Sequence, residues 1–283
     1  MKTILVTGGA GFIGSHLCRR LKEEGHAVIS LDNYFTGRKD NHVEGVEYRV
    51  GHTKDIETLV PGHVDLVYHL GEYSRPEQSV LEPDLTWDLN AAGTFAVLEY
   101  CRKRDTRIIY AGSSTKFADG GLGRDQSPYA FTKATNTELV RNYGTWYGLP
   151  FAITYFYNVY GPGELAEGKY ATVIARFARQ CAEGNSLTVT APGTQQRIFT
   201  HIDDITDGLL LVGEKGEGDE FGLGAEESYS ILEVAKMFGA PIEMCPERMG
   251  NRMSAVLDTT KSRALGWSAK RSLPEYIDSL KTA

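Results

Sequence analysis

The stretch from Thr3 to Asp32 reads TILVTGGAGFIGSHLCRRLKEEGHAVISLD, which has the layout of a strand, a glycine-rich turn, a helix and a second strand. The glycines let the backbone turn tightly and approach a pyrophosphate without a Cβ in the way. The free N–H groups and the positive dipole end of the following helix attract anionic phosphates. The stretch therefore predicts a dinucleotide-binding unit.

The glycines of this turn fit two spacings. Gly9, Gly11 and Gly14 match G-x-G-x-x-G, whereas Gly8, Gly11 and Gly14 match G-x-x-G-x-x-G. Either spacing alone is a weak signal, because glycine-rich turns also serve as plain corners between a strand and a helix. The strand before it, the helix after it and the acid on the next strand together favour nucleotide binding.

Asp32 stands at the end of the second strand, where its carboxylate can accept hydrogen bonds from a ribose diol. A carboxylate at this point repels the 2′-phosphate of NADP. The sequence therefore predicts NAD as the cofactor.

The composition is that of an ordinary globular enzyme, with 41% hydrophobic and 24% charged residues among 283. The net charge of −7 argues against nucleic acid as a partner. The four cysteines form no C-x-x-C pair, which favours reduced thiols, and we expect no metal site. The first strand begins after two residues, and no apolar segment is long enough to span a membrane. We expect a cytoplasmic protein that binds no membrane.

Strands and helices alternate through the first half of the chain. The run at 64–70 is almost continuously apolar, as expected of a parallel strand covered on both faces. The alternation predicts an α/β fold with a doubly wound parallel sheet, the Rossmann arrangement. We assign residues 1–160 to a cofactor-binding Rossmann domain, to which 193–213 return, and 161–283 to a smaller mixed α/β substrate-binding domain.

A phenol and an ammonium group lie four residues apart at Tyr129 and Lys133, and hence on one face of a helix. Tyrosine is a weak base at its usual pKa of about 10, but a nearby Lys⁺ and the positive nicotinamide favour the phenolate. Hydroxyl residues at 113–115 follow a strand that ends near Ala111, at the edge where ligands bind in parallel sheets. By itself the tyrosine–lysine pair is more often incidental on a surface helix, but the neighbouring motifs favour a catalytic pair.

With these motifs the chain resembles the extended short-chain dehydrogenase/reductase family, the NAD-dependent nucleotide-sugar epimerases and dehydratases. The resemblance covers nearly the whole chain, and the order of the motifs along it makes the assignment specific. The motifs that carry it are TGGAGFIG at 7–14, DN at 32–33, TGR at 36–38, HL at 69–70, SPY at 127–129 with Lys133, YNVYGP at 157–162, RIFTHIDD at 197–204 and LGW at 265–267.

The resemblance implies that Ser114, Tyr129 and Lys133 form a catalytic triad. Tyr129 would remove the proton from a sugar hydroxyl as hydride passes to NAD, Ser114 would hold that oxygen, and Lys133 would bind the nicotinamide ribose. The cofactor site implied by the sequence comprises Gly8, Gly11, Phe12, Ile13, Gly14, Asp32, Asn33, Thr36, Leu70, Gly71, Tyr129, Lys133 and Tyr155.

The resemblance also implies a substrate site for a nucleotide-sugar, most simply a UDP-sugar. Ser114, Thr115 and Asn158 would contact it, and Arg197 and Arg248 would clamp its diphosphate, a task suited to the guanidinium fork. The alternatives are that Arg197 forms an ion pair with Asp203 or Asp204, and that Asn158 caps a turn.

The family pattern narrows the reaction. Dehydratases and decarboxylases of the family carry a carboxylate two positions after the hydroxyl residue, and here Lys116 stands at that place. This favours 4-epimerisation of a UDP-hexose through a 4-keto sugar, with NAD retained. The alternatives are an NAD(P)H-dependent reductase or a dehydratase of a nucleotide-deoxysugar, and a non-catalytic NAD-binding protein.

The resemblance further implies a homodimer in which two helices of each subunit, near 84–104 and 127–148, meet their counterparts. Both helices carry apolar residues beyond those needed to cover one sheet face. We expect that surface to include Phe95, Val97, Leu98, Leu139 and Val140.

Overall fold

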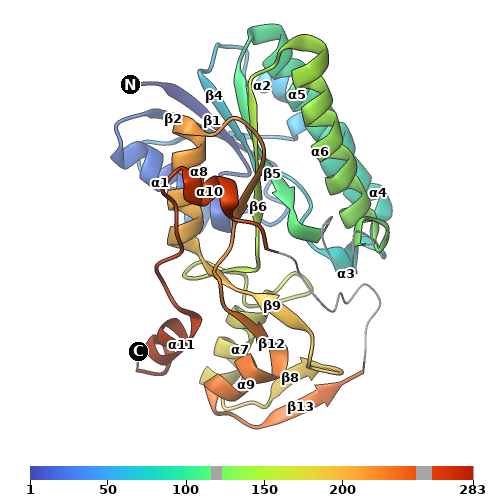
Figure 1. Cartoon of the computed structure of the whole chain (residues 1–283), viewed down its shortest axis with the longest axis vertical. Coiled ribbons are helices and arrows are strands. Elements are labelled where there is room, and N and C mark those ends of the chain that lie inside the picture. Colours follow the sequence, from blue (N-terminus) through green and yellow to red (C-terminus); the bar gives the residue numbers. More distant parts are fainter. Residues whose placement is uncertain (116–122, 247–256, 283) are drawn as a thin grey trace.

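The computed structural model describes residues 1–115, 123–246 and 257–282. Within them, seven parallel strands form one sheet in the order β11-β6-β5-β4-β1-β2-β3, which confirms the predicted doubly wound α/β fold (Figure 1). The direction of strand order reverses between β1 and β4, where α/β sheets bind their ligands. The strands are β1 (Thr3–Thr7), β2 (Ala27–Asp32), β3 (Glu47–Val50), β4 (Leu66–His69), β5 (Arg107–Ser113), β6 (Phe151–Phe156) and β11 (Gly218–Leu223).

Helices cover both faces of this sheet because its strands are apolar on both sides. On one face, α1 and α8 pack with side chains such as Leu17 and Leu209 against Ile4 and Val6 of β1. On the other face lie α5 and α6 (Figure 1). The helices of this part are α1 (Phe12–Glu23), α2 (Ile56–Leu59), α3 (Pro76–Ser79), α4 (Pro83–Trp87), α5 (Gly93–Arg104), α6 (Pro128–Tyr147), α8 (Ile202–Lys215) and α10 (Thr260–Ala264), with short helical turns at 39–41, 53–55 and 88–92.

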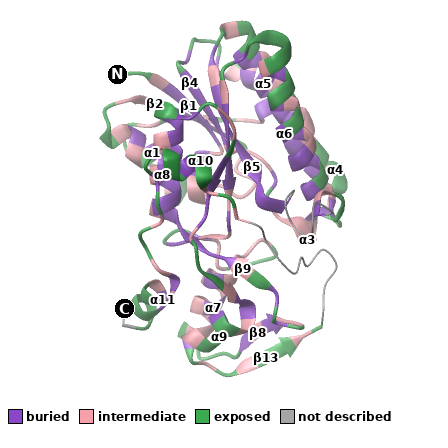
Figure 2. Cartoon of the chain, viewed as in Figure 1, coloured by how far each residue is buried: buried purple, intermediate pink, exposed green. Residues whose placement is uncertain are grey.

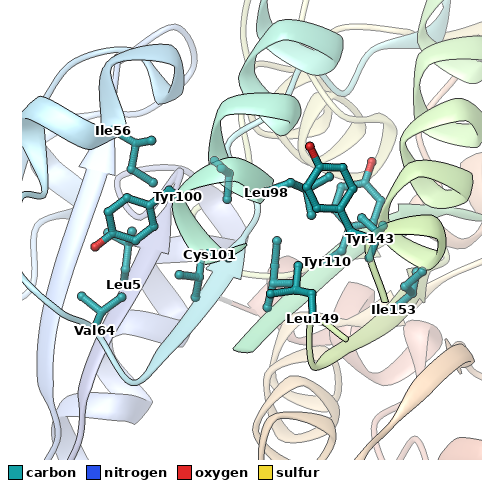
Figure 3. Close-up of a cluster of buried hydrophobic side chains, with 14 of the residues drawn as sticks. Leu5, Ile56, Val64, Leu98, Tyr100, Cys101, Tyr110, Tyr143, Leu149 and Ile153 are labelled. Atoms are coloured by element: carbon teal, nitrogen blue, oxygen red, sulfur yellow. The ribbon is translucent and has the colours of Figure 1, made fainter. Parts of the chain in front are cut away.

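The apolar cluster under α5 and α6 corrects part of the predicted dimer surface. Figure 3 shows Leu98 and Tyr143 from these helices packed with strand residues such as Tyr110 and Ile153. Val97, Leu98 and Val140 are fully buried in this cluster and Leu139 packs against it, so these residues cover the sheet. Phe95, in contrast, leaves 53% of its surface exposed on the outer side of α5.

The remaining elements form a smaller α/β region with its own core (Figure 1). Phe177, Val189, Val234 and Ile277 are buried in that core, to which both α7 and α9 contribute. The elements are β7 (Val159–Tyr160), α7 (Val173–Ala182), β8 (Leu187–Thr190), β9 (Gln196–Ile198), β10 (Thr200–His201), β12 (Ser228–Ser230), α9 (Ile231–Phe238), β13 (Ile242–Cys245) and α11 (Leu273–Thr282).

The chain returns to the large sheet over a longer stretch than the predicted 193–213. After α8 it forms β11, the edge strand beside β6, and α10 packs on β11. Phe221 and Leu223 of β11 are buried against α8, so the inner half of the strand is apolar. Among the described helices, none is both long and apolar enough to cross a membrane.

Candidate active site

A cavity of about 780 Å³ opens at the carboxyl ends of the central strands and reaches into the smaller region. It brings together nearly all the predicted site residues. Those that line it are Gly8, Gly11, Phe12, Ile13, Gly14, Asp32, Asn33, Thr36, Leu70, Gly71, Ser114, Thr115, Tyr129, Lys133, Asn158 and Arg197.

The glycine turn is packed too closely for side chains. Gly8 has a φ of +74°, and a Cβ on it would lie 2.9 Å from the Cα of Gly71. A Cβ on Gly14 would lie 2.1 Å from the carbonyl oxygen of Gly8, so the first turn of α1 sits directly against the loop. The amino end of α1 therefore faces the cavity across bare backbone, which fits a bound pyrophosphate.

Asp32 lies at the end of β2 on the wall of the same cavity. Its two carboxylate oxygens accept hydrogen bonds from the backbone N–H groups of Tyr34, at 2.7 Å, and Ala10, at 2.9 Å. Burial raises the pKa of Asp32, and these two bonds oppose that shift. A Cβ on Gly37 would lie 2.8 Å from Asp32 Oδ1, so glycine keeps the approach to the carboxylate open. The arrangement fits the ribose diol of NAD.

The start of α6 fixes the two catalytic candidates. Ser127 caps the helix by accepting a hydrogen bond from the N–H of Ala130 at 3.2 Å, and Pro128 occupies the first turn. Tyr129 and Lys133, one turn apart, are buried together on the side that faces the cavity.

The hydroxyl that contacts Tyr129 belongs to Ser113, one residue before the predicted Ser114. Tyr129 donates a hydrogen bond to Ser113 Oγ at 3.0 Å, and Ser113 Oγ lies 2.8 Å from Thr115 Oγ1. β5 continues through Ser113, and successive side chains of a strand point to opposite sides. Only one of two neighbouring serines can therefore face Tyr129, and the sequence does not say which. Ser114 is also buried and also lines the cavity.

Tyr155 was predicted to contact the cofactor, but it lies in the core. Only 1% of it is exposed, and its hydroxyl donates to Asp219 at 2.6 Å. The next residue, Phe156, lines the cavity instead. The alternation along β6 is again the reason, since a shift of one residue moves a side chain to the other face.

Asn158 and Arg197 both line the cavity. They lie in segments that connect the large sheet with the smaller region. The Asn158 amide donates to the carbonyl of Ile198 at 2.7 Å, so it also ties two loops together. The aspartates proposed as alternative partners of Arg197 bind Arg271, which lies 3.2 Å from Asp203 and 2.6 Å from Asp204. Arg248 and Lys116 lie outside the described residues.

Several charged residues of the cavity wall were not predicted, among them Glu72, Arg75 and Glu164. Arg75 donates to the carbonyl of Tyr170 at 2.8 Å and to Ser74, and burial lowers its pKa against the opposing effects of Tyr129 and Glu164. Burial likewise raises the pKa of Glu164 to about 7.

The positions of Glu72 and Arg75 in the sequence could have indicated that they belong to the site. Glu72 and Arg75 lie three and six residues after His69, the last residue of β4, and so in the loop at the ligand-binding edge of the sheet. In the described part of the chain, no group of three His, Cys, Asp or Glu side chains is placed to hold a metal ion.

Comparison with known proteins settles the family. Residues 4–224 match the NAD dependent epimerase/dehydratase family. The chain belongs to this family. NAD is therefore its cofactor. The glycine turn and Asp32 line the part of the cavity that fits the dinucleotide.

Relatives within the family differ in the reaction named for them. The chain is 32% identical over 292 residues to a putative UDP-glucose 4-epimerase of Methanocaldococcus jannaschii, covering 97% of this chain and 95% of that protein. It is 31% identical over 255 residues to a UDP-N-acetyl-alpha-D-glucosaminuronate decarboxylase of Bacillus cytotoxicus, covering 83% and 78%. The structure resembles a UDP-glucose 4-epimerase of Thermotoga maritima with UDP-glucose, with a TM-score of 0.91, 27% identity and coverage of 99% and 97%.

Proposed function

We propose that this enzyme catalyses the NAD-dependent epimerisation of a nucleotide-sugar, a UDP-hexose at C4. The observation that carries the proposal is the hydrogen bond from Tyr129 to Ser113, at 3.0 Å, in the wall of the cavity that also contains the glycine turn. Lys133 stands one helical turn from Tyr129 in the same wall. A phenol, a hydroxyl and an ammonium group at this place are the parts needed to move a proton on and off a sugar hydroxyl.

Each of these side chains has a distinct task in the proposed reaction. Tyr129 takes the proton from the sugar hydroxyl and later returns it, and Ser113 holds the same oxygen in place. Lys133 supplies a positive charge that favours the phenolate form of Tyr129. NAD, when bound, supplies the acceptor and donor of the hydride, so the sugar passes through a 4-keto state without net oxidation.

The residues after Ser113 support epimerisation over elimination or decarboxylation. In the family pattern, the acid of dehydratases and decarboxylases stands two positions after the hydroxyl residue. Counted from Ser113 this position is Thr115, and counted from the predicted Ser114 it is Lys116. Neither residue is an acid, so the site lacks the carboxylate at that position in either register.

The proposal is tested by turnover in deuterated water with UDP-glucose, UDP-N-acetylglucosamine and UDP-glucuronate, followed by NMR of the products. We expect the C4 epimer of at least one substrate, no deuterium on any sugar carbon and no accumulation of free NADH. Deuterium at C5 together with loss of the 6-hydroxyl would assign the enzyme to the dehydratases. Loss of carbon dioxide from UDP-glucuronate, which also leaves solvent deuterium at C5, would assign it to the decarboxylases.

A reductase of a nucleotide-deoxysugar is the competing redox function. Such an enzyme releases its cofactor in each turnover, whereas an epimerase retains it. Net consumption of NADH or NADPH with a keto-deoxysugar nucleotide would support the reductase. Complete absence of turnover and of nucleotide-sugar binding would favour a non-catalytic NAD-binding protein.

A further inference from the structure

Glu72 lies directly against the proposed catalytic lysine. It follows β4 by three residues, and only 2% of its side chain is exposed. Its Oε2 accepts a hydrogen bond from Lys133 Nζ, which also donates to the carbonyl of Ala111 at the end of β5. The two charged groups form an ion pair inside the protein, 61 residues apart in sequence.

The other oxygen of Glu72 is held from three elements. Oε1 accepts hydrogen bonds from Thr94 of α5 at 2.8 Å, from Tyr110 of β5 at 3.1 Å and from Asn136 of α6 at 2.8 Å. Burial by itself opposes ionisation of Glu72, but the charge of Lys133 and these bonds outweigh it and leave the pKa below its ordinary value. The carboxylate is therefore charged and fixed in direction.

Among the titratable groups around Glu72, Lys133 is the charged partner of the carboxylate. The titratable side chains that face Glu72 are His69 from β4, Tyr110 from β5 and Lys133 from α6, and Tyr129 lies one turn along α6. Burial lowers the pKa of His69 to about 4, so this histidine is neutral at pH 7. Its ring bonds Thr7 and Thr94 and so supports the network without adding charge.

We propose that Glu72 is a positioning residue that keeps the Lys133 ammonium charged and correctly placed for the reaction of Tyr129. The proposal rests on the function proposed above for Lys133. A buried lysine without a partner loses its proton more easily, because desolvation penalises the charged form. Its long side chain would also lose the contact that fixes its conformation. Glu72 prevents both effects.

The test compares Glu72→Gln with Tyr110→Phe in the NAD-loaded enzyme. Glu72→Gln removes the charge but keeps the shape, whereas Tyr110→Phe removes one bond to Oε1 and keeps the charge. We expect Glu72→Gln to lower kcat about a hundredfold, the lower end of what a positioned acid–base group contributes. The KM for the nucleotide-sugar and the retention of NAD should change little. Tyr110→Phe should stay close to wild type, and Glu72→Asp should recover part of the rate.

Two further measurements distinguish a positioning role of Glu72 from a purely structural role. In Glu72→Gln the pH–activity profile should change its shape, because a buried negative charge beside Lys133 is removed. In a Lys133→Met background, Glu72→Gln should cause no further loss of kcat, since Glu72 acts through Lys133. Unchanged kcat in Glu72→Gln, or losses that simply multiply in the double variant, would overturn the proposal. Full activity of Lys133→Met alone would instead overturn the function proposed for the site.

Discussion

The hydroxyl of Tyr129 and the Oγ of Ser113 lie 3.0 Å apart, although the two residues belong to different elements, α6 and β5. In the proposed reaction, this contact makes Ser113 the hydroxyl residue that shares a substrate oxygen with Tyr129. It also fixes the position at which an additional acid would have to stand, and that position is occupied by Thr115.

Ser113→Ala should therefore be more harmful than Ser114→Ala, which provides a matched control one residue away. We expect the first change to lower kcat at least about tenfold, because a hydrogen bond to the reacting oxygen is lost. The second should change kcat by less than about threefold. Steady-state kinetics of both variants with bound NAD measures the difference. A larger loss of kcat in Ser114→Ala than in Ser113→Ala would support Ser114, the serine predicted from the sequence.

Asp32 should decide between NAD and NADP. We expect Asp32→Asn to reduce the preference for NAD by about 1.5–3 kcal/mol, since a charged acceptor facing the ribose diol is lost together with its repulsion of a 2′-phosphate. The asparagine keeps a side-chain oxygen near the N–H groups of Ala10 and Tyr34 that now bind the carboxylate. Calorimetric titration of cofactor-free protein with both dinucleotides tests this. Tighter binding of NADP by the wild type would contradict it.

Arg197 should contribute to nucleotide-sugar binding. We expect Arg197→Ala to weaken the affinity for UDP-hexose by about 1.5–3 kcal/mol, the usual scale for a hydrogen bond to a charged group. The affinity for NAD should stay nearly constant. The same change at Arg248 should have a similar effect according to the family pattern. Loss of NAD affinity with intact substrate affinity would place these arginines at the cofactor instead.

Glu164 should make the stability of the protein depend on pH. Its pKa is raised to about 7 in the folded protein by burial, whereas the unfolded chain has the ordinary value near 4.5. Between these values the native state holds the extra proton, so the stability from this group is full below pH 4.5 and is lost as pH rises through 7. The loss amounts to about 3 kcal/mol.

Glu164→Gln should remove this dependence, because an amide does not titrate. Urea unfolding of the wild type and the variant at pH 5 and pH 8 provides the measurement. From pH 5 to pH 8, the free energy of unfolding should fall more in the wild type than in the variant. An equal change in both proteins would show that Glu164 ionises normally in the fold.

A homodimer should form through the outer surface of α5 and α6, where exposed positions remain (Figure 2). Phe95 is 53% exposed on α5, while Phe131 and Trp146 are 41% and 58% exposed on α6. Aromatic residues exposed on these two helices fit a two-fold interface. Phe95→Glu should shift the mass from dimer to monomer in light scattering at micromolar concentration. A wild-type monomer under these conditions would exclude the dimer.

Most of the fold and much of the candidate site could be predicted from local patterns in the sequence. The glycine turn after β1 and the acid ending β2 are read from neighbouring residues, and the cavity contains both. Tyr129 and Lys133 are four residues apart, so a helix alone puts them on one face. The regular capping of α6 by Ser127 makes that helix begin where the sequence indicates.

The tertiary structure decided what depends on strand facing and on contacts between distant segments. Ser113 rather than Ser114 meets Tyr129, and Phe156 rather than Tyr155 meets the cavity, because a strand turns adjacent side chains to opposite faces and only packing determines which face is which. Glu72 meets Lys133 because the loop after β4 lies beside α6 at the edge of the sheet. No local periodicity encodes that meeting, since it depends on how separate elements pack.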